Sequence, residues 1–275
     1  MRRFDLRGSH VLLSGAAGGI GSAVATRLHR AGARLVLTDR DGEALKVVAG
    51  HLDARRPPSC LVADFAAPMG VDGLVSQLQD RSLDVFIQCA GIAPGGGFEG
   101  QSAATIDAVL DINLRAAIAL THRLLPQLLA ARHAAIVHVA SGAGLLGPGG
   151  LAAYAASKFG LVGFSEALRA ELRGRVYVSV VCPPLVRTDI IRNTAALAGG
   201  EPEDVTALHA LVHRFGMDPD RVARAIINAI ERNRGRVVVG VASRALLLAR
   251  AVSPSLTDRV NHAVFRALSR RGTLS

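Results

Sequence analysis

Long apolar runs and aromatic side chains are scarce in this chain of 275 residues. No run of about 18 uncharged apolar residues occurs, so we expect no membrane-spanning helix. The early arginines are not followed by an apolar segment with a cleavage site, and we therefore expect no signal peptide and a cytoplasmic protein. Tryptophan is absent and aromatic residues make up 4%. The arginines thus lack interleaved aromatic side chains that stack on nucleic-acid bases.

Cysteine is also rare, and its pattern excludes a disulfide framework. Cys60, Cys89 and Cys182 are odd in number and widely spaced, and each lies in or beside an apolar segment. This arrangement favours reduced, buried thiols over disulfides or metal ligands. We predict no metal site.

The net charge of +10 would suit a nucleic-acid-binding protein, but its distribution argues against that function. Residues 241–275 hold six arginines and one aspartate, a net charge of +5 that is half of the excess. Elsewhere the arginines are dispersed. We therefore expect no nucleic-acid partner.

Short apolar segments alternate with helical segments along the chain. The alternation is typical of a parallel sheet with helices on both faces, whose strands are uniformly apolar because both faces are buried. We predict an α/β fold with a Rossmann-like, doubly wound parallel sheet of about seven strands. No linker or repeat divides residues 1–240, so we predict one domain there and a basic helical extension over 241–275. The expected strands are 11–13, 34–38, 61–63, 85–89, 136–140, 176–181 and 237–239, and the later helices are 104–132 (as two helices), 154–172 and 220–233.

A glycine-rich turn, Ser14-Gly15-Ala16-Ala17-Gly18-Gly19-Ile20-Gly21, joins the first expected strand to the first helix. Glycine lets the backbone turn tightly and approach a pyrophosphate, which the helix N-terminus favours. Asp39 ends the second strand, where a carboxylate can bond the adenosine ribose hydroxyls. The turn could instead be a plain strand-to-helix connection, and Asp39 a helix cap.

The same region bears on the choice between two nicotinamide cofactors. Asp39 repels a 2′-phosphate, whereas the neighbouring Arg40 attracts one. Gly18 stands where a basic side chain would help to hold that phosphate. We therefore favour NAD over NADP.

Tyr154 and Lys158 form a pair spaced for proton transfer, with Ser141 upstream. An i, i+4 spacing on a helix places both side chains on one face. A nearby ammonium favours the phenolate, so we expect Lys158 to lower the pKa of Tyr154 toward the working range. Only Lys46 and Lys158 are lysines in this arginine-rich chain. By itself the pattern is weak, and its weight comes from the other motifs.

Taken together, these motifs resemble the classical short-chain dehydrogenase/reductase family from about residue 10 to residue 240. The family's glycine motif is present with Ser14 in place of threonine. Its Asn-Asn-Ala-Gly segment is reduced to Gln88-Cys89-Ala90-Gly91, a departure that affects local hydrogen bonding more than chemistry. The later Pro-Gly motif appears as Pro183-Pro184, and the second proline removes an N–H from the turn.

The resemblance implies a role for each matching residue. Tyr154 is the acid/base, Lys158 its partner, and Ser141 holds the substrate oxygen. Asn113 holds a water in the proton relay, although it could also simply cap or kink a helix. The implied cofactor-binding residues are Gly15, Ala17, Gly19, Ile20, Gly21, Asp39, Arg40, Asp64, Ala90, Gly91, Tyr154, Lys158, Pro183, Val186 and Thr188.

The implied function is an NAD(P)-dependent oxidoreductase that acts on CH–OH donors and interconverts a secondary alcohol and a ketone. The alternative is a dinucleotide-binding regulator or scaffold of the same fold with weak catalysis. The family also implies a homodimer or homotetramer paired through helices 104–132 and 154–172.

Substrate choice is expected to depend on residues 142–151 and on a lid over about 189–215. The aliphatic side chains in these segments favour a lipophilic substrate, although they could equally pack into the hydrophobic core. Nearby arginines and histidines leave a small acid as an alternative substrate. The apolar candidates are Leu145, Leu146, Ile190, Ile191, Leu197, Leu208, Leu211, Val212 and Phe215; the charged ones are Arg187, Arg192, His209 and His213.

The C-terminal extension has the pattern of a basic amphipathic helix. From Leu256 onward, apolar residues recur along one side and basic residues along the other. Such a helix can lie on an anionic membrane surface as a peripheral contact. It could instead pack on its own domain or on a partner subunit. The apolar side is Leu256, Val260, Val264 and Leu268, and the basic side is Arg259, His262, Arg266 and Arg270.

Overall fold

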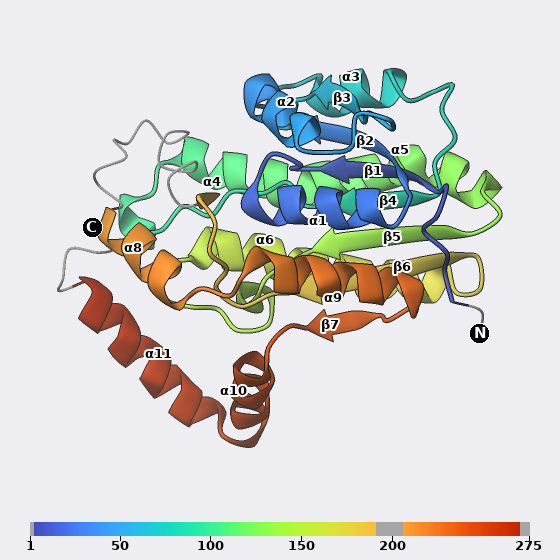
Figure 1. Ribbon diagram of the computed structural model, residues 1–275. Helices are drawn as coiled ribbons and strands as arrows, with labels where there is room; N and C mark the ends of the chain where they lie inside the picture. The colour runs from blue at the N-terminus through green and yellow to red at the C-terminus, as the bar shows by residue number, and fades with distance from the viewer. Residues whose placement is uncertain (1–2, 191–205, 270–275) are drawn as a thin grey trace.

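Seven parallel strands form one sheet in the computed structural model, which describes residues 3–190 and 206–269 (Figure 1). The strand order is β3-β2-β1-β4-β5-β6-β7, so the direction of winding reverses between β1 and β4. The predicted doubly wound sheet is confirmed. The bounds are β1 His10–Ser14, β2 Arg34–Asp39, β3 Ser59–Val62, β4 Val85–Gln88, β5 Ala134–Val139, β6 Val176–Cys182 and β7 Arg236–Val238.

Helices cover both faces of this sheet (Figure 1). One face carries α1 (Gly19–Arg30), α2 (Gly42–Gly50) and α9 (Pro219–Glu231), and the other α3 (Gly70–Ser76), α5 (Ala116–Ala130) and α6 (Ala152–Glu171). Successive strand residues alternate between the two cores: Val11 and Leu13 belong to the first, and Leu12 to the second. Because both faces are covered, the central strands are mostly apolar, and polar residues within them such as His138 and Ser179 are buried.

The expected helix over 104–132 is interrupted, as predicted. It consists of α4 (Ala103–Leu110), one π-helical turn (Asp111–Arg115) and α5. The interruption falls at Asn113, although Pro126 lies inside α5. A π turn widens the helix locally and redirects side chains, a feature frequent at functional sites.

One predicted strand is more exposed than its sequence indicated. We expected a buried strand over 61–63, but β3 begins at Ser59 and lies at the edge of the sheet, paired only with β2. Its residues therefore alternate in exposure, and Cys60 is exposed rather than buried. Cys89 is half-buried and Cys182 buried, and all three thiols are free.

The C-terminal extension forms two helices beyond β7, α10 (Val241–Val252) and α11 (Pro254–Ser269) (Figure 1). The side-chain amide of Asn261 on α11 donates to Gly147 O at 2.8 Å, and its oxygen accepts from Gly149 N at 3.0 Å. Arg250 on α10 donates to Leu145 O at 2.6 Å. Both helices thus contact the 142–151 segment expected to border the substrate.

Candidate active site

In the glycine-rich turn after β1, neighbouring backbone atoms occupy the space that side chains would need. Gly15 has φ +65°, and a Cβ there would lie 2.5 Å from Ala90 N. A Cβ on Gly21 would lie 2.0 Å from Gly15 O. Glycine is therefore required at both positions, and the backbone at the N-terminus of α1 stays open to a ligand.

Asp39 stands at the end of β2, beside this turn. Its carboxylate accepts hydrogen bonds from Ala17 N at 3.0 Å and from Asp41 N at 3.3 Å. Asp41 caps α2 by accepting from Ala44 N, so the cap that Asp39 could have supplied comes from Asp41 instead. The carboxylate of Asp39 lines the cleft described next.

A cleft of about 270 Å³ lies over the carboxyl ends of β1, β2 and β4, the place where open α/β sheets bind ligands. Eleven predicted cofactor-binding residues line it: Gly15, Ala17, Gly19, Ile20, Gly21, Asp39, Arg40, Asp64, Ala90, Gly91 and Thr188. The lining does not include Tyr154, Lys158, Pro183 or Val186. Two further lining residues, Gly18 and Ile190, were expected near the phosphate and in the lid rather than as cofactor-binding residues. Sequence reasoning missed Asp41, Ala44, Ala63, Phe65, Cys89, Ile92, Ile112 and Asp189, most of which are neighbours of predicted residues.

The altered Gln88-Cys89 segment retains a link to the glycine turn. Ser14 Oγ donates to Gln88 Oε1 at 2.6 Å and accepts from Cys89 N at 3.2 Å. Gln88 Nε2 is buried without a hydrogen-bond partner. The departure from the family pattern therefore changes local hydrogen bonding, as expected. The hydrogen bonds of Ser14 still connect β1 to the end of β4.

Ser141, Tyr154 and Lys158 lie at the carboxyl end of β5 and the start of α6. Tyr154 and Lys158 are both buried, and the Lys158 ammonium lies 5.7 Å from the centroid of the Tyr154 ring. Lys158 Nζ donates to Val139 O at 3.1 Å. Ser141 Oγ accepts from Ala143 N at 3.1 Å and shares a hydrogen bond with Tyr154.

Burial shifts the pKa values of both Tyr154 and Lys158. It raises the pKa of Tyr154, although the hydrogen bond with Ser141 lowers it in part. The predicted lowering of this pKa by Lys158 is therefore wrong for the protein alone, because desolvation of the phenolate outweighs its partners. Burial also lowers the pKa of Lys158 to about 8.

Gly91 joins the cleft to these buried side chains. It lines the cleft, and a Cβ at this position would lie 3.3 Å from Lys158 Nζ and 2.9 Å from Asn113 Oδ1. The missing side chain therefore leaves the ammonium close to the cleft.

Asn113 is fully buried and holds neighbouring segments together. It donates to Ile92 O at 2.9 Å and to Ser157 Oγ at 3.1 Å, and its oxygen accepts from Ile92 N at 2.8 Å. Ser157 in turn donates to Tyr154 O. Asn113 therefore does more than cap or kink a helix: it ties the π turn to the Tyr154 helix and to Ile92 in the irregular segment after Gly91.

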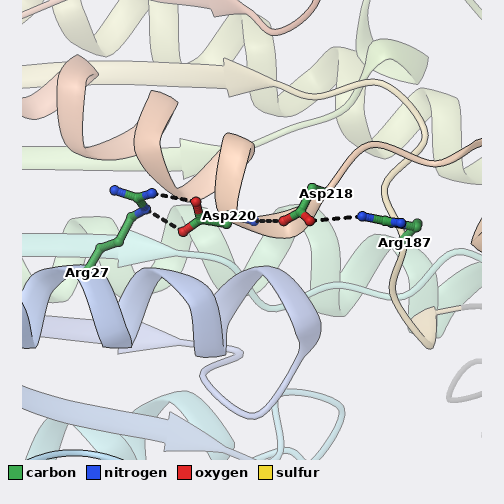
Figure 2. Close-up of polar contacts among 4 residues, drawn as sticks. All are labelled: Arg27, Arg187, Asp218 and Asp220. Carbon is green, nitrogen blue, oxygen red and sulfur yellow. Dashed lines mark hydrogen bonds and ion pairs between the residues drawn. The ribbon is translucent and has the colours of Figure 1, made fainter.

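A chain of ion pairs anchors the segment after β6. Figure 2 shows Arg27 of α1 bound to Asp220, and Arg187 bound to Asp218 at 2.9 Å. Asp218 caps α9 by accepting from Asp220 N at 2.8 Å. The Arg27 guanidinium lowers the pKa of Asp220, which keeps this carboxylate charged.

The anchored segment reaches the glycine turn. Val186 is buried and bridges to Met217, and Pro183 O accepts from Gly142 N at 2.7 Å. Thr188 then lies against α1, since a Cβ on Gly19 would be 2.7 Å from Thr188 Cγ2. Pro183 and Val186 are thus placed as supports, and Thr188 at the cleft.

Part of the expected lid lies outside the described residues, including Ile191, Arg192 and Leu197. In the described part, α8 (Thr206–Phe215) carries a buried Val212 and an exposed Phe215. Sequence reasoning missed the convergence of His209 and His213 on Asp189. The His-x-x-x-His spacing on a helix was the available signal.

Comparison with known proteins identifies the family. The short chain dehydrogenase family matches residues 9–197, and this chain belongs to it. A bovine relative, dehydrogenase/reductase SDR family member 7B, is 32% identical over 94% of this chain and 82% of its own length.

Two solved structures share the fold. A short chain dehydrogenase/reductase from Burkholderia phymatum, in complex with NAD, has a TM-score of 0.83 and 26% identity over 92% of this chain and 96% of its own. A short-chain dehydrogenase from Sphingobium yanoikuyae, in complex with NADPH, has a TM-score of 0.75. It is 28% identical over 91% of this chain and 96% of its own.

Proposed function

We propose that this protein is an NAD(P)-dependent oxidoreductase that interconverts a secondary alcohol and a ketone. The observation that carries the proposal is the position of Gly91, between the cleft lined by the glycine turn and Asp39 and the buried Tyr154–Lys158 pair. Family membership supports oxidoreductase chemistry.

The residues that line the cleft suit a dinucleotide. The backbone of the glycine turn would face the pyrophosphate, and the Asp39 carboxylate would accept from ribose hydroxyls. Asp39 favours NAD over NADP through repulsion of a 2′-phosphate, with Arg40 as the opposing influence. Lys158 would bond the nicotinamide ribose. When bound, the nicotinamide supplies hydride transfer and, when oxidised, a positive charge.

The chain's own residues would move the proton. Tyr154 Oη takes the alcohol proton during oxidation and returns it during reduction, while Ser141 holds the substrate oxygen. Because burial raises the pKa of Tyr154 in the protein alone, added positive charge must stabilise the phenolate. Lys158 supplies part of that charge, and Asn113 holds a water that passes the proton onward.

A lipophilic substrate fits the surroundings of this site. Leu145 and Leu146 lie in the 142–151 segment that α10 and α11 contact, and α8 adds Val212 and Phe215. The test is absorbance of reduced nicotinamide with NAD⁺ or NADP⁺ across sterols, retinoids, long-chain alcohols and small hydroxy acids. Turnover restricted to the small acids would contradict the substrate class.

The alternative function is a dinucleotide-binding regulator with weak catalysis. The unpartnered Gln88 Nε2 beside the cleft is the observation that favours it. Tight nucleotide binding without turnover on any member of the panel would support the alternative and contradict the enzymatic proposal.

We infer a peripheral membrane contact for the C-terminal extension. Among the described residues, no helix is both long enough and apolar enough to span a bilayer. On α11, Leu256, Val260 and Val264 form an exposed apolar stripe beside Arg259 and Arg266, while neighbouring Asn261 faces the body. Such an arrangement suits an anionic membrane surface, because the apolar side chains can enter the lipid layer while the arginines bind the headgroups.

Liposome co-sedimentation tests this contact. We expect binding to anionic vesicles, weaker binding to zwitterionic ones, and loss of binding when Val260 and Val264 are changed to Glu. The matched control is Val47→Glu with Val62→Glu, because these valines are similarly exposed on α2 and β3. Equal sedimentation of both double variants would contradict the contact.

We also infer a homodimer or homotetramer paired through α5 and α6. The supporting observation is exposed apolar side chains on these helices: Ile118, Leu129 and Phe159. Light scattering should show a smaller species for Ile118→Glu. A monomeric unmodified protein would contradict the pairing.

A further inference from the structure

Two imidazoles and one carboxylate converge at the rim of the cleft. His209 and His213 lie one turn apart on α8, with ring centroids 4.3 Å apart. Asp189 follows Thr188 and lines the cleft. The Nε2 atoms of His209 and His213 lie 2.9 Å and 3.7 Å from the same oxygen, Asp189 Oδ1. All three donor atoms lie within 4.8 Å of one another.

The two separations from Asp189 Oδ1 are close to those in a tetrahedral metal site. With metal–ligand bonds of about 2.0–2.1 Å, two donors of a tetrahedron lie roughly 3.3 Å apart. The observed 2.9 Å and 3.7 Å lie on either side of that value. The hydrogen bond between His209 and Asp189 accounts for the shorter distance, and His213 Nε2 faces the same oxygen from 3.7 Å.

The ligand set also indicates the kind of metal. Two histidines at i and i+4 on one helix face are a known arrangement for zinc. Imidazole nitrogens favour Zn²⁺, Ni²⁺, Cu²⁺ and Co²⁺, whereas Mg²⁺ and Ca²⁺ prefer oxygen ligands. The Asp189 side chain is 61% exposed, so an ion can enter from solvent and keep a water as fourth ligand.

We propose that Asp189, His209 and His213 form a binding site for a divalent transition metal, best suited to Zn²⁺. The bound ion would fasten α8 to the segment that carries Thr188. It would therefore hold one wall of the substrate region against the rim of the nucleotide cleft. The site does not depend on the proposed enzymatic function, because a protein that only binds nucleotide would contain the same three ligands.

Cobalt spectroscopy on the full-length, tag-free protein tests the site. Co²⁺ alone is titrated into protein freed of metal by a chelator, and the visible ligand-field absorption is recorded. Zn²⁺ is then added as a competitor and its affinity measured by calorimetry. The variants are His209→Ala, His213→Ala and Asp189→Asn, and the matched control is His51→Ala, an exposed histidine outside the cluster. Unfolding midpoints in chelator establish that each variant is folded.

We expect one Co²⁺ per chain, displaced by Zn²⁺. Each histidine variant should bind at least about tenfold more weakly, because each loses one of three protein ligands, and His51→Ala should be unchanged. Sub-stoichiometric binding, or binding equally strong in both histidine variants and the control, would overturn the proposal. Zn²⁺ should also raise the unfolding midpoint of the unmodified protein, and raise that of His213→Ala by less at the same Zn²⁺ concentration.

Discussion

Replacing Lys158 with methionine removes a buried ammonium while keeping a side chain of similar length. Lys158 is 4% exposed and donates to Val139 O, and among the residues the structure describes no carboxylate forms an ion pair with it. Burial lowers its pKa from 10.5 to about 8. At about 1.4 kcal/mol per pH unit, the charged form destabilises the folded protein by roughly 3 kcal/mol.

The pH dependence isolates this contribution. Below about pH 8 the lysine is protonated in both folded and unfolded chains, so the full penalty is present. Between about pH 8 and pH 10.5 the folded protein releases the proton first, and its relative stability rises. From about pH 7 to pH 9.5, the unfolding free energy of the unmodified protein should therefore rise by about 2 kcal/mol relative to Lys158→Met.

Urea denaturation at the two pH values measures the difference, and the chain supplies its own control. The other lysine, Lys46, is exposed and paired with Glu43, so Lys46→Met should follow the unmodified protein at both pH values. Burial raises the pKa of Cys89 and of Cys182 to about 12, although Lys158 lowers each in part. Both thiols therefore stay protonated in the folded protein from about pH 7 to pH 9.5 with or without Lys158, and their contribution cancels between the variants. A stability difference between Lys158→Met and the unmodified protein that does not change with pH would refute the reasoning.

Three further predictions concern the cleft. Asp39→Asn should shift the ratio of NADP to NAD affinity by at least about tenfold toward NADP, because the repelling charge is gone; titration with both reduced nucleotides measures it, and an unchanged ratio would contradict the role of Asp39. Ser14→Ala should lower the unfolding free energy by about 1–3 kcal/mol, since Gln88 Oε1 loses its buried donor; urea denaturation checks it, with Ser14→Thr as the conservative control. Gly91→Ala should weaken nucleotide binding, because the new methyl meets buried polar atoms, whereas Gly73→Ala, with open space around it, should leave calorimetric affinity unchanged.

Much of the fold followed from local pattern. The central strand β4 is buried along its whole length, and its residues 85–87 are apolar because both faces of the sheet are covered. The glycine turn could be read directly, since Gly15 and Gly21 have no room for a Cβ. The edge strand β3 could not, because Leu61 and Val62 resemble a buried strand in sequence and only the strand order shows that one edge is open.

The sequence predicted which residues meet at the site but not the direction of the Tyr154 pKa shift. Spacing alone put Tyr154 and Lys158 on one helix face, and the structure brings Ser141 to them. The direction of the Tyr154 pKa depends on burial by surrounding elements, which no local motif contains. The same holds for the ion-pair chain of Figure 2, whose partners Arg27 and Asp220 are separated by 193 positions.

The most direct test of the enzymatic account compares the chain's two tyrosines. Tyr154→Phe removes the proposed proton carrier, whereas Tyr177→Phe alters a side chain that packs against Phe4. In single-turnover hydride transfer, followed by reduced-nicotinamide absorbance, Tyr154→Phe should be slower by at least about 10²-fold with nucleotide affinity and unfolding midpoint retained. Tyr177→Phe should react at the normal rate. Near-normal transfer by Tyr154→Phe would contradict the account.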